Sequence, residues 1–151
     1  MSIIETRDFG VLELHPEAIY QFPQGVYGFS SSTEFALFAK AVDEVDLLYL
    51  QSTIDPSLCF FVFEPLDFFP DFDPILSKED LSDMDVSTAD DLIFLSVATI
   101  PTNVKEMSLN IKSPIVLNPK SQKGMQIFLQ NVNYPVRYHP FSASGEDGAP
   151  C

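Results

Sequence analysis

The carboxylates of one acidic stretch are the residues with the clearest potential for chemistry. Between residues 64 and 91 the chain carries ten acidic residues and one lysine. The spacing of the first three ligands of a calcium-binding EF-hand loop is present at Asp83, Asp85 and Ser87. The sixth position of such a loop needs glycine and the twelfth a bidentate glutamate, but Thr88 and Phe94 occupy them. The pattern therefore predicts no metal site and no cofactor.

No other residues form a recognisable catalytic arrangement. His15 and His139 are the only histidines, and they lack the spacing of a zinc site. The chain has no G-x-S-x-G, Walker A or G-x-G-x-x-G motif. We therefore predict a binding protein without catalytic residues rather than an enzyme. One alternative stays open at this stage, a metal-dependent hydrolase that uses the carboxylates between Asp67 and Asp91 as acid and base.

The acidic stretch begins with PLDFFPDFDP, residues 65–74, which combines rings, charges and prolines. Phe favours burial, ionised Asp favours water, and Pro interrupts sheet hydrogen bonding. In one interpretation, Phe69 and Phe72 plug the end of a barrel. In the other, a partly exposed Phe68 and the neighbouring acids form a partner-binding surface, because an aromatic anchor beside charges is common in interfaces. The candidates for that surface are Asp67, Phe68, Phe69, Asp71, Phe72 and Asp73.

A second candidate set for partner binding is polar and surrounds a proline. Its members are Asn110, Ser113 and Pro114. Residues of these types also close turns. The sequence therefore leaves a structural role and a binding role open for this set.

Net charge restricts the classes of partner. The chain has 22 acidic and 8 basic residues, which give a net charge of −14. Such a surface repels nucleic-acid phosphates and anionic lipid, so we predict no direct nucleic-acid binding and no membrane association. The same charge fits either a basic protein partner or a role in solubility alone, and the sequence leaves both open. Cys59 and Cys151 do not suggest a disulfide framework, and the start MSIIETRD lacks the pattern of a signal peptide, so we predict a cytoplasmic protein.

Strand signals dominate among the elements that would position these residues. Apolar and polar residues alternate at 107–112 and 125–130, which is typical of half-buried strands. The continuous apolar runs 58–63 and 92–95 indicate strands that are covered on both faces. Further strands are expected at 12–14, 35–39 and 47–50.

Only one region has a helical pattern. The S-x-x-D start signal at Ser77 precedes Leu81 and Met84, and a weaker copy begins at Ser87. Many short strands between turn residues predict a mostly β chain, a compact antiparallel β-barrel-like single domain with one or two short helices over residues 1–141. Residues 142–151 are small and polar, and we expect a disordered tail there.

The order of several short motifs resembles one protein family. The chain carries Phe9-Gly10, then FPQGVYGF at 22–29, LQS at 50–52 and FFPDF at 68–72. Later come MSLN at 107–110, SPIVLN at 113–118, GMQ at 124–126, and Tyr134 with Arg137. In this order the motifs resemble the flagellar assembly factor FliW family over about residues 3–140. Departures from the family pattern at Tyr49, Phe72 and Ser113 keep side-chain size or polarity.

That resemblance implies an antiparallel β-barrel-like fold and a regulator with two protein partners, flagellin and the RNA-binding translational repressor CsrA. In this family the free regulator binds CsrA and relieves its repression of flagellin mRNA, and accumulating flagellin captures the regulator. The acidic region from Glu64 to Asp91 is then expected to lower the positive potential around the RNA surface of CsrA. A flagellin export chaperone that does not bind CsrA is the alternative within the same family.

Overall fold

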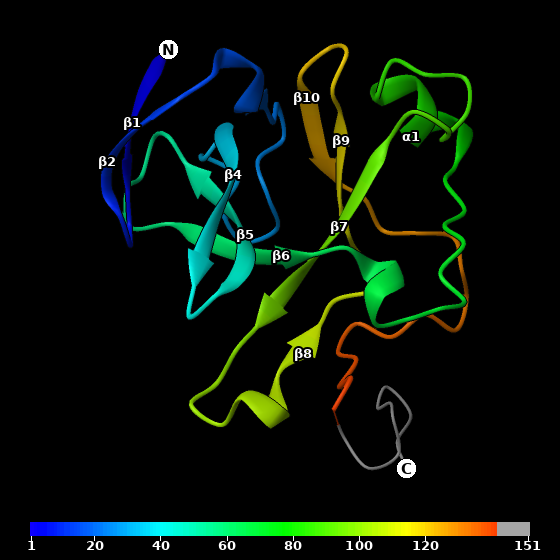
Figure 1. Ribbon diagram of the computed structural model, residues 1–151. Coiled ribbons are helices and arrows are strands. Elements are labelled where there is room, and N and C mark those ends of the chain that lie inside the picture. Colours follow the sequence, from blue (N-terminus) through cyan, green and yellow to red (C-terminus); the bar gives the residue numbers. More distant parts are fainter. Residues whose placement is uncertain (142–151) are drawn as a thin grey trace.

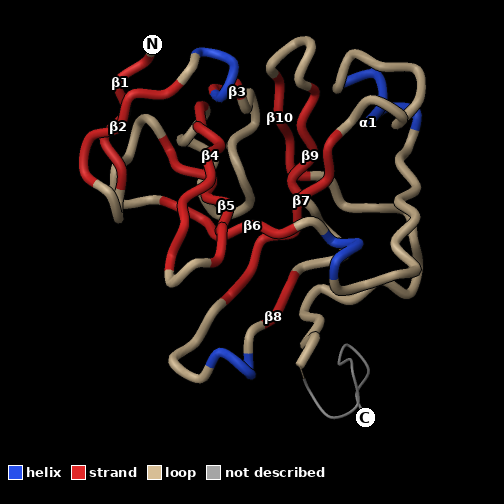
Figure 2. Tube along the Cα trace, in the orientation of Figure 1, coloured by secondary structure: helices blue, strands red, loops and turns tan. Residues whose placement is uncertain are grey.

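The computed structural model describes residues 1–141, and strands account for most of its regular structure, as Figure 2 shows. The strands are β1 (Ser2–Thr6), β2 (Gly10–Leu14), β3 (Ile19–Gln21), β4 (Glu34–Val42), β5 (Val45–Ser52), β6 (Cys59–Phe63), β7 (Ile93–Thr99), β8 (Ser108–Leu109), β9 (Ile115–Asn118) and β10 (Lys123–Gln126). Seven of them close a ring in the order β6-β5-β4-β3-β10-β9-β7, because β7 pairs back with β6. Strand β8 pairs with the end of β7, and β1 and β2 form a separate hairpin (Figure 1).

The pairings of the ring are antiparallel with one exception. Strands β3 and β10 run parallel and meet through the single residue pair Gln21 and Lys123. The longest ladder joins β4 to β5 and ends at Asp43 and Glu44, whose φ angles are 51° and 68°. Positive φ at both central residues is the geometry of a tight hairpin turn that matches the twist of the strands. The predicted mostly β, barrel-like fold is therefore confirmed.

The ring encloses an apolar core. The residues without exposed surface in this core include Phe22, Phe35, Leu50, Ile115 and Leu117. They come from strands or strand ends on all sides of the ring, so the barrel interior is filled by side chains. Burial of each such side chain contributes roughly 1.5–3 kcal/mol to folding.

The outer face of the ring is also apolar, and two separate sets of segments cover it; we call them the first and the second coat. The hairpin of β1 and β2 forms the first coat, in which Phe9, Leu12 and Leu14 pack against Phe38 and Tyr49. The ring of Phe9 meets that of Tyr49 edge to face at a centroid distance of 5.1 Å. The run 58–63, predicted to be covered on both faces, lies between the interior and these outer clusters.

The second coat covers the outer faces of β7 and β9. It consists of residues 64–92 and the C-terminal stretch 127–141, which lie side by side at the right of Figure 1. Helix α1 (Lys78–Asp83) begins as predicted at Ser77, whose Oγ accepts a hydrogen bond from the backbone N–H of Asp80 at 3.0 Å. The remaining helices are the 3-10 turns η1 (Pro16–Ala18), η2 (Pro65–Asp67) and η3 (Val104–Glu106).

Three local predictions differ from the structure. No helix follows Ser87, where the chain forms bends and a turn. The alternating run 107–112 contributes only the two residues of β8. The run 125–130 leaves regular structure after Gln126, although Ile127 and Leu129 stay buried. Ile127 still donates to the carbonyl of Pro114 at 3.1 Å, but Pro has no N–H to return the bond, so the ladder stops. The expected tail, residues 142–151, lies outside the described residues.

One close approach inside the barrel has a direct consequence for stability. A methyl group on Gly124 of β10 would overlap the ring of Phe22, which is completely buried. We expect Gly124→Ala to lower the free energy of unfolding by roughly 1–3 kcal/mol through overpacking, measured by urea denaturation. The control is the same substitution in a Phe22→Leu background, where the smaller side chain leaves room. Equal costs in both backgrounds would contradict this packing account.

Candidate functional site

The stretch PLDFFPDFDP leaves the sheet and crosses the outer face of the barrel wall without a strand partner. Its backbone groups bond partly within the stretch and partly to the side chains of Asn131, Tyr134 and Tyr138. The Oη of Tyr134 accepts a hydrogen bond from the N–H of Asp73 at 2.6 Å and donates to the carbonyl of Asp71 at 3.1 Å. The amide of Asn131 donates to the carbonyl of Asp73 and accepts from the N–H of Ile75. These bonds replace a sheet ladder that the prolines prevent.

The three phenylalanines of the stretch all contribute to the second coat, to different degrees. Phe72 is buried, with 9% of its surface exposed, and its ring stacks on that of Tyr134 at a centroid distance of 5.7 Å. Phe68 and Phe69 are half-buried and pack against the same cluster. The expected burial of Phe72 is therefore correct, but its location differs from the expectation. The ring lies on the outer face of the wall and not in the barrel end, because the interior is already filled.

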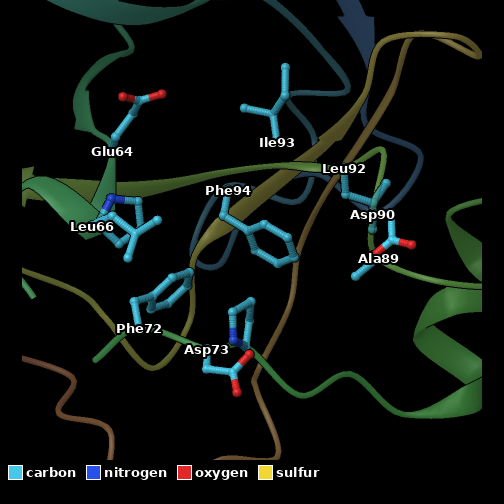
Figure 3. Close-up of a pocket in the computed structure, with 11 residues that line it drawn as sticks. Glu64, Leu66, Phe72, Asp73, Ala89, Asp90, Leu92, Ile93 and Phe94 are labelled. Carbon is cyan, nitrogen blue, oxygen red and sulfur yellow. The ribbon is translucent and has the colours of Figure 1, made fainter. Parts of the chain in front are cut away.

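A hollow of about 470 Å³ opens between this stretch and the start of β7 (Figure 3). Its floor is apolar and contains Phe72, Leu92 and Phe94. The rings of Phe72 and Phe94 meet edge to face at a centroid distance of 5.9 Å. Apolar concave sites with a few polar groups are typical places for a ligand or a partner side chain.

Three carboxylates stand around this floor, and we call the site the acid-rimmed hollow. Figure 3 shows Glu64, Asp73 and Asp90 on three different sides of the two rings. Within residues 1–141 none of these carboxylates forms an ion pair. Residues 142–151 contain no basic residue that could pair with them. The rim is therefore a concentration of uncompensated negative charge above an apolar surface.

Two other acids of the stretch have a lysine partner. Lys120 lies 3.5 Å from Asp91, and Lys123 lies 3.6 Å from Asp85. Such exposed pairs contribute little to stability, but they reduce the local negative charge. Glu64, Asp73 and Asp90 at the acid-rimmed hollow have no such lysine partner within residues 1–141.

The polar candidate set lies away from the acid-rimmed hollow; its hydrogen bonds close a turn, and Asn110 also lines a second hollow, at one end of the barrel. The Oδ1 of Asn110 accepts a hydrogen bond from the N–H of Ser113 at 2.9 Å, which closes the turn before Pro114. Ser113 and Pro114 are buried, and the carbonyl of Ser113 accepts a bond from the amide of Gln126 at 3.0 Å. The structure thus brings Phe72 and Asp73 of the predicted residues to the acid-rimmed hollow, and does not bring the polar set there.

Sequence reasoning missed part of the acid-rimmed hollow. Glu64 and Asp90 belong to the acidic stretch, but their spacing gives no sign that they meet across one surface. Leu92 and Phe94 were expected only as strand residues. The available signal is the spacing of two between Leu92, just before β7, and Phe94 in β7, since residues two apart share one face of an extended chain.

Residues 1–141 contain no group of three or more His, Cys, Asp or Glu side chains that could hold a metal ion. Burial raises the pKa of Cys59 to about 11, which leaves an unreactive thiol.

None of the helices in residues 1–141 is long and apolar enough to cross a membrane. The acid-rimmed hollow is suited to binding basic side chains.

The two hydrogen bonds of the Tyr134 hydroxyl hold the loop beside this hollow and should contribute measurably to the free energy of unfolding. We expect Tyr134→Phe to lower the free energy of unfolding by about 1 kcal/mol, because two hydrogen bonds are lost while the ring contacts remain. Denaturant unfolding measures the change. The matched control is Tyr27→Phe, since Tyr27 is exposed and its hydroxyl has no hydrogen-bond partner within residues 1–141. Equal stabilities of the two variants would contradict the role of the Tyr134 hydroxyl.

Comparisons with known proteins agree on one family. The profile of the family described as FliW protein matches residues 3–140. Proteins named flagellar assembly factor FliW are 36% identical over 139 residues in Leptospira biflexa, covering 91% of this chain and 90% of the relative. In Heliobacterium modesticaldum the identity is 34% over 146 residues, covering 95% and 94%.

A solved structure gives the same result for the fold. The crystal structure of a flagellar assembly factor FliW superposes with a TM-score of 0.82 at 28% identity, covering 93% of this chain and 98% of that one. The sequence match and the structural match extend over nearly the same residues as the motifs of the sequence analysis. The chain therefore belongs to the FliW family of flagellar assembly factors.

Proposed function

We propose that this FliW-family chain is a non-enzymatic, cytoplasmic regulator that binds flagellin and the translational repressor CsrA, and that it antagonises CsrA repression of flagellin mRNA. The observation that carries the proposal is the acid-rimmed hollow on a chain of this family. The names of the relatives support a role in flagellar assembly and do not specify a partner. The two partners are those that the resemblance to this family implies, and the chemistry of the surface supports a basic partner.

The acid-rimmed hollow fits a basic protein partner such as CsrA. An RNA-binding protein must present lysine or arginine side chains to phosphates. These side chains have apolar stems and charged ends, so they can lie on Phe72 and Phe94 while the charge reaches Glu64, Asp73 or Asp90. A cation above an aromatic ring gains about 0.5–1 kcal/mol at exposed sites. The hollow thus offers an apolar surface for the stem of a basic side chain and carboxylates for its charged end.

Antagonism follows from charge at close range. A bound body with a net charge of −14 lowers the positive potential that RNA phosphates would meet on the partner. The screening length is about 8 Å at physiological salt, so only carboxylates near the RNA surface contribute. The carboxylates of the acid-rimmed hollow can therefore reduce RNA binding in two ways, by holding basic side chains of the partner and by repelling phosphates nearby.

Charge reversal at the rim tests this role. We expect Asp73→Lys with Asp90→Lys to weaken CsrA binding, and the relief of RNA binding, by about tenfold, because both attraction and RNA repulsion are reduced. Both residues are exposed, so the fold should be retained. The control is Glu13→Lys with Asp46→Lys, which changes the net charge equally at exposed positions outside the acidic stretch. A similar loss in both double variants would mean that net charge alone matters and the hollow does not.

The partner exchange is tested by calorimetry with purified components. We expect this chain to bind the CsrA of the same organism, and we expect flagellin to abolish that binding when it is added first. Binding to flagellin alone would favour the export chaperone that does not contact CsrA. Binding to neither protein would contradict the proposed function, provided that the cooperative unfolding of the sample shows that it is folded.

A further inference from the structure

A second hollow, of about 290 Å³, lies at one end of the barrel, and we call it the barrel-end hollow. Its floor includes Val26, Phe60 and Val97, which also belong to the interior core. The mouths of β-barrels are common sites for ligands because the strands hold the lining side chains in place. No residue of this hollow lines the acid-rimmed hollow, so the two are separate sites.

The rim of the barrel-end hollow exposes two apolar side chains from segments far apart in the chain. Tyr27 is 55% exposed, and Val136 is 61% exposed. Phe29 lies just beyond the hollow, is exposed as well, and meets Phe60 edge to face at a centroid distance of 5.8 Å. The apolar surface therefore continues outside the hollow. A chain segment that passes over the rim would cover more of it than a small molecule confined to the hollow.

The polar groups of this hollow have the opposite character to the acid-rimmed hollow. Arg137 is exposed and lines it, and none of the described lining residues is acidic. Within residues 1–141 Arg137 makes no hydrogen bond and no ion pair. An unpaired guanidinium beside exposed apolar side chains is a group that recognises carboxylates.

The walls of the hollow are held by hydrogen bonds before any ligand arrives. The N–H of Tyr27 donates to Oε1 of Gln126 at 2.9 Å, and Gln126 is itself tied to the carbonyl of Ser113. On the other side, Leu109 and Tyr138 exchange two backbone bonds of 2.8 and 2.9 Å next to Arg137. A preformed site loses little entropy on binding.

We propose that the barrel-end hollow binds a partner segment that places apolar side chains between Tyr27 and Val136 and an aspartate or glutamate side chain on Arg137. The continuous apolar rim favours a passing segment, and the lone cation favours an acidic side chain within it. The site is distinct from the acid-rimmed hollow, so the inference stands independently of CsrA or flagellin binding.

Short peptides test the proposal by nuclear magnetic resonance on the full, isotope-labelled chain. The probes are acetyl-Gly-Val-Phe-Asp-Gly-amide, its Asn analogue, its Lys analogue, and acetyl-Gly-Val-Phe with a free terminal carboxylate. They are added up to about 5 mM, which suits millimolar affinities. We expect the Asp peptide to shift the amides of Tyr27, Val97 and Arg137. We expect it to bind about tenfold more tightly than the Asn peptide.

Two variants connect the preference to one side chain. We expect Arg137→Gln to remove the Asp-over-Asn preference and to leave the Asn peptide unaffected. Lys105→Gln is the control, because it makes the same charge change at an exposed lysine outside the hollow and should leave the preference intact. Both residues are exposed, and thermal unfolding of each variant checks that the fold is retained.

Several outcomes would overturn the proposal. Equal affinity for the Asp, Asn and Lys peptides would show that Arg137 recognises nothing. Binding of the free terminal carboxylate alone would show that the hollow takes a chain end instead of an internal acid. Shifts confined to the acid-rimmed hollow would place the binding there. The absence of shifts with every peptide would show that no external segment binds.

Discussion

The barrel wall is apolar on both of its faces, and the burial of its outer face is the constraint on which the rest of the structure depends. The interior accounts for one set of side chains, such as Leu95 and Leu117. The neighbouring residues Phe94, Ala98 and Val116 point outward and would remain in water without a cover. A hairpin covers one part of this face and two irregular segments cover the other. The two coats therefore bury apolar side chains of the wall that would otherwise be exposed to water.

The composition of the second coat follows from that task. It must bring apolar rings to the wall while its own exposed side remains soluble, and PLDFFPDFDP does both by separating rings with acids and prolines. Because prolines exclude a ladder, Tyr134 and Asn131 supply the missing hydrogen bonds. The acids cannot enter the apolar layer, so they remain at its edges. The acid-rimmed hollow is thus a consequence of how the wall is covered.

Local patterns in the sequence predicted the longer strands β4 to β7, missed β1, β3 and β9, and were insufficient for the coats. The continuous run 58–63 correctly indicated a strand with two covered faces, and Ser77 correctly indicated a helix start. The position of Phe72 on the outer wall depends on Tyr134, which is 62 residues away in the chain, and no local pattern encodes that contact. Glu64 and Asp90 line one hollow because of contacts between segments that are distant in the chain, and no local pattern encodes this proximity either. Contacts between irregular segments follow no period, so they are visible only in the folded chain.

One stretch of chain borders both hollows, and this limits how their ligands can influence one another. Tyr134 holds the loop at the acid-rimmed hollow, and Val136 and Arg137 line the barrel-end hollow. Between them the carbonyl of Pro135 accepts bonds from Ile111 and Lys112, which anchors the stretch to buried backbone. A packed segment does not deform gradually, so coupling through it requires a second discrete arrangement. Without one, a partner at either hollow can exclude another only through steric overlap or charge repulsion between the bound partners.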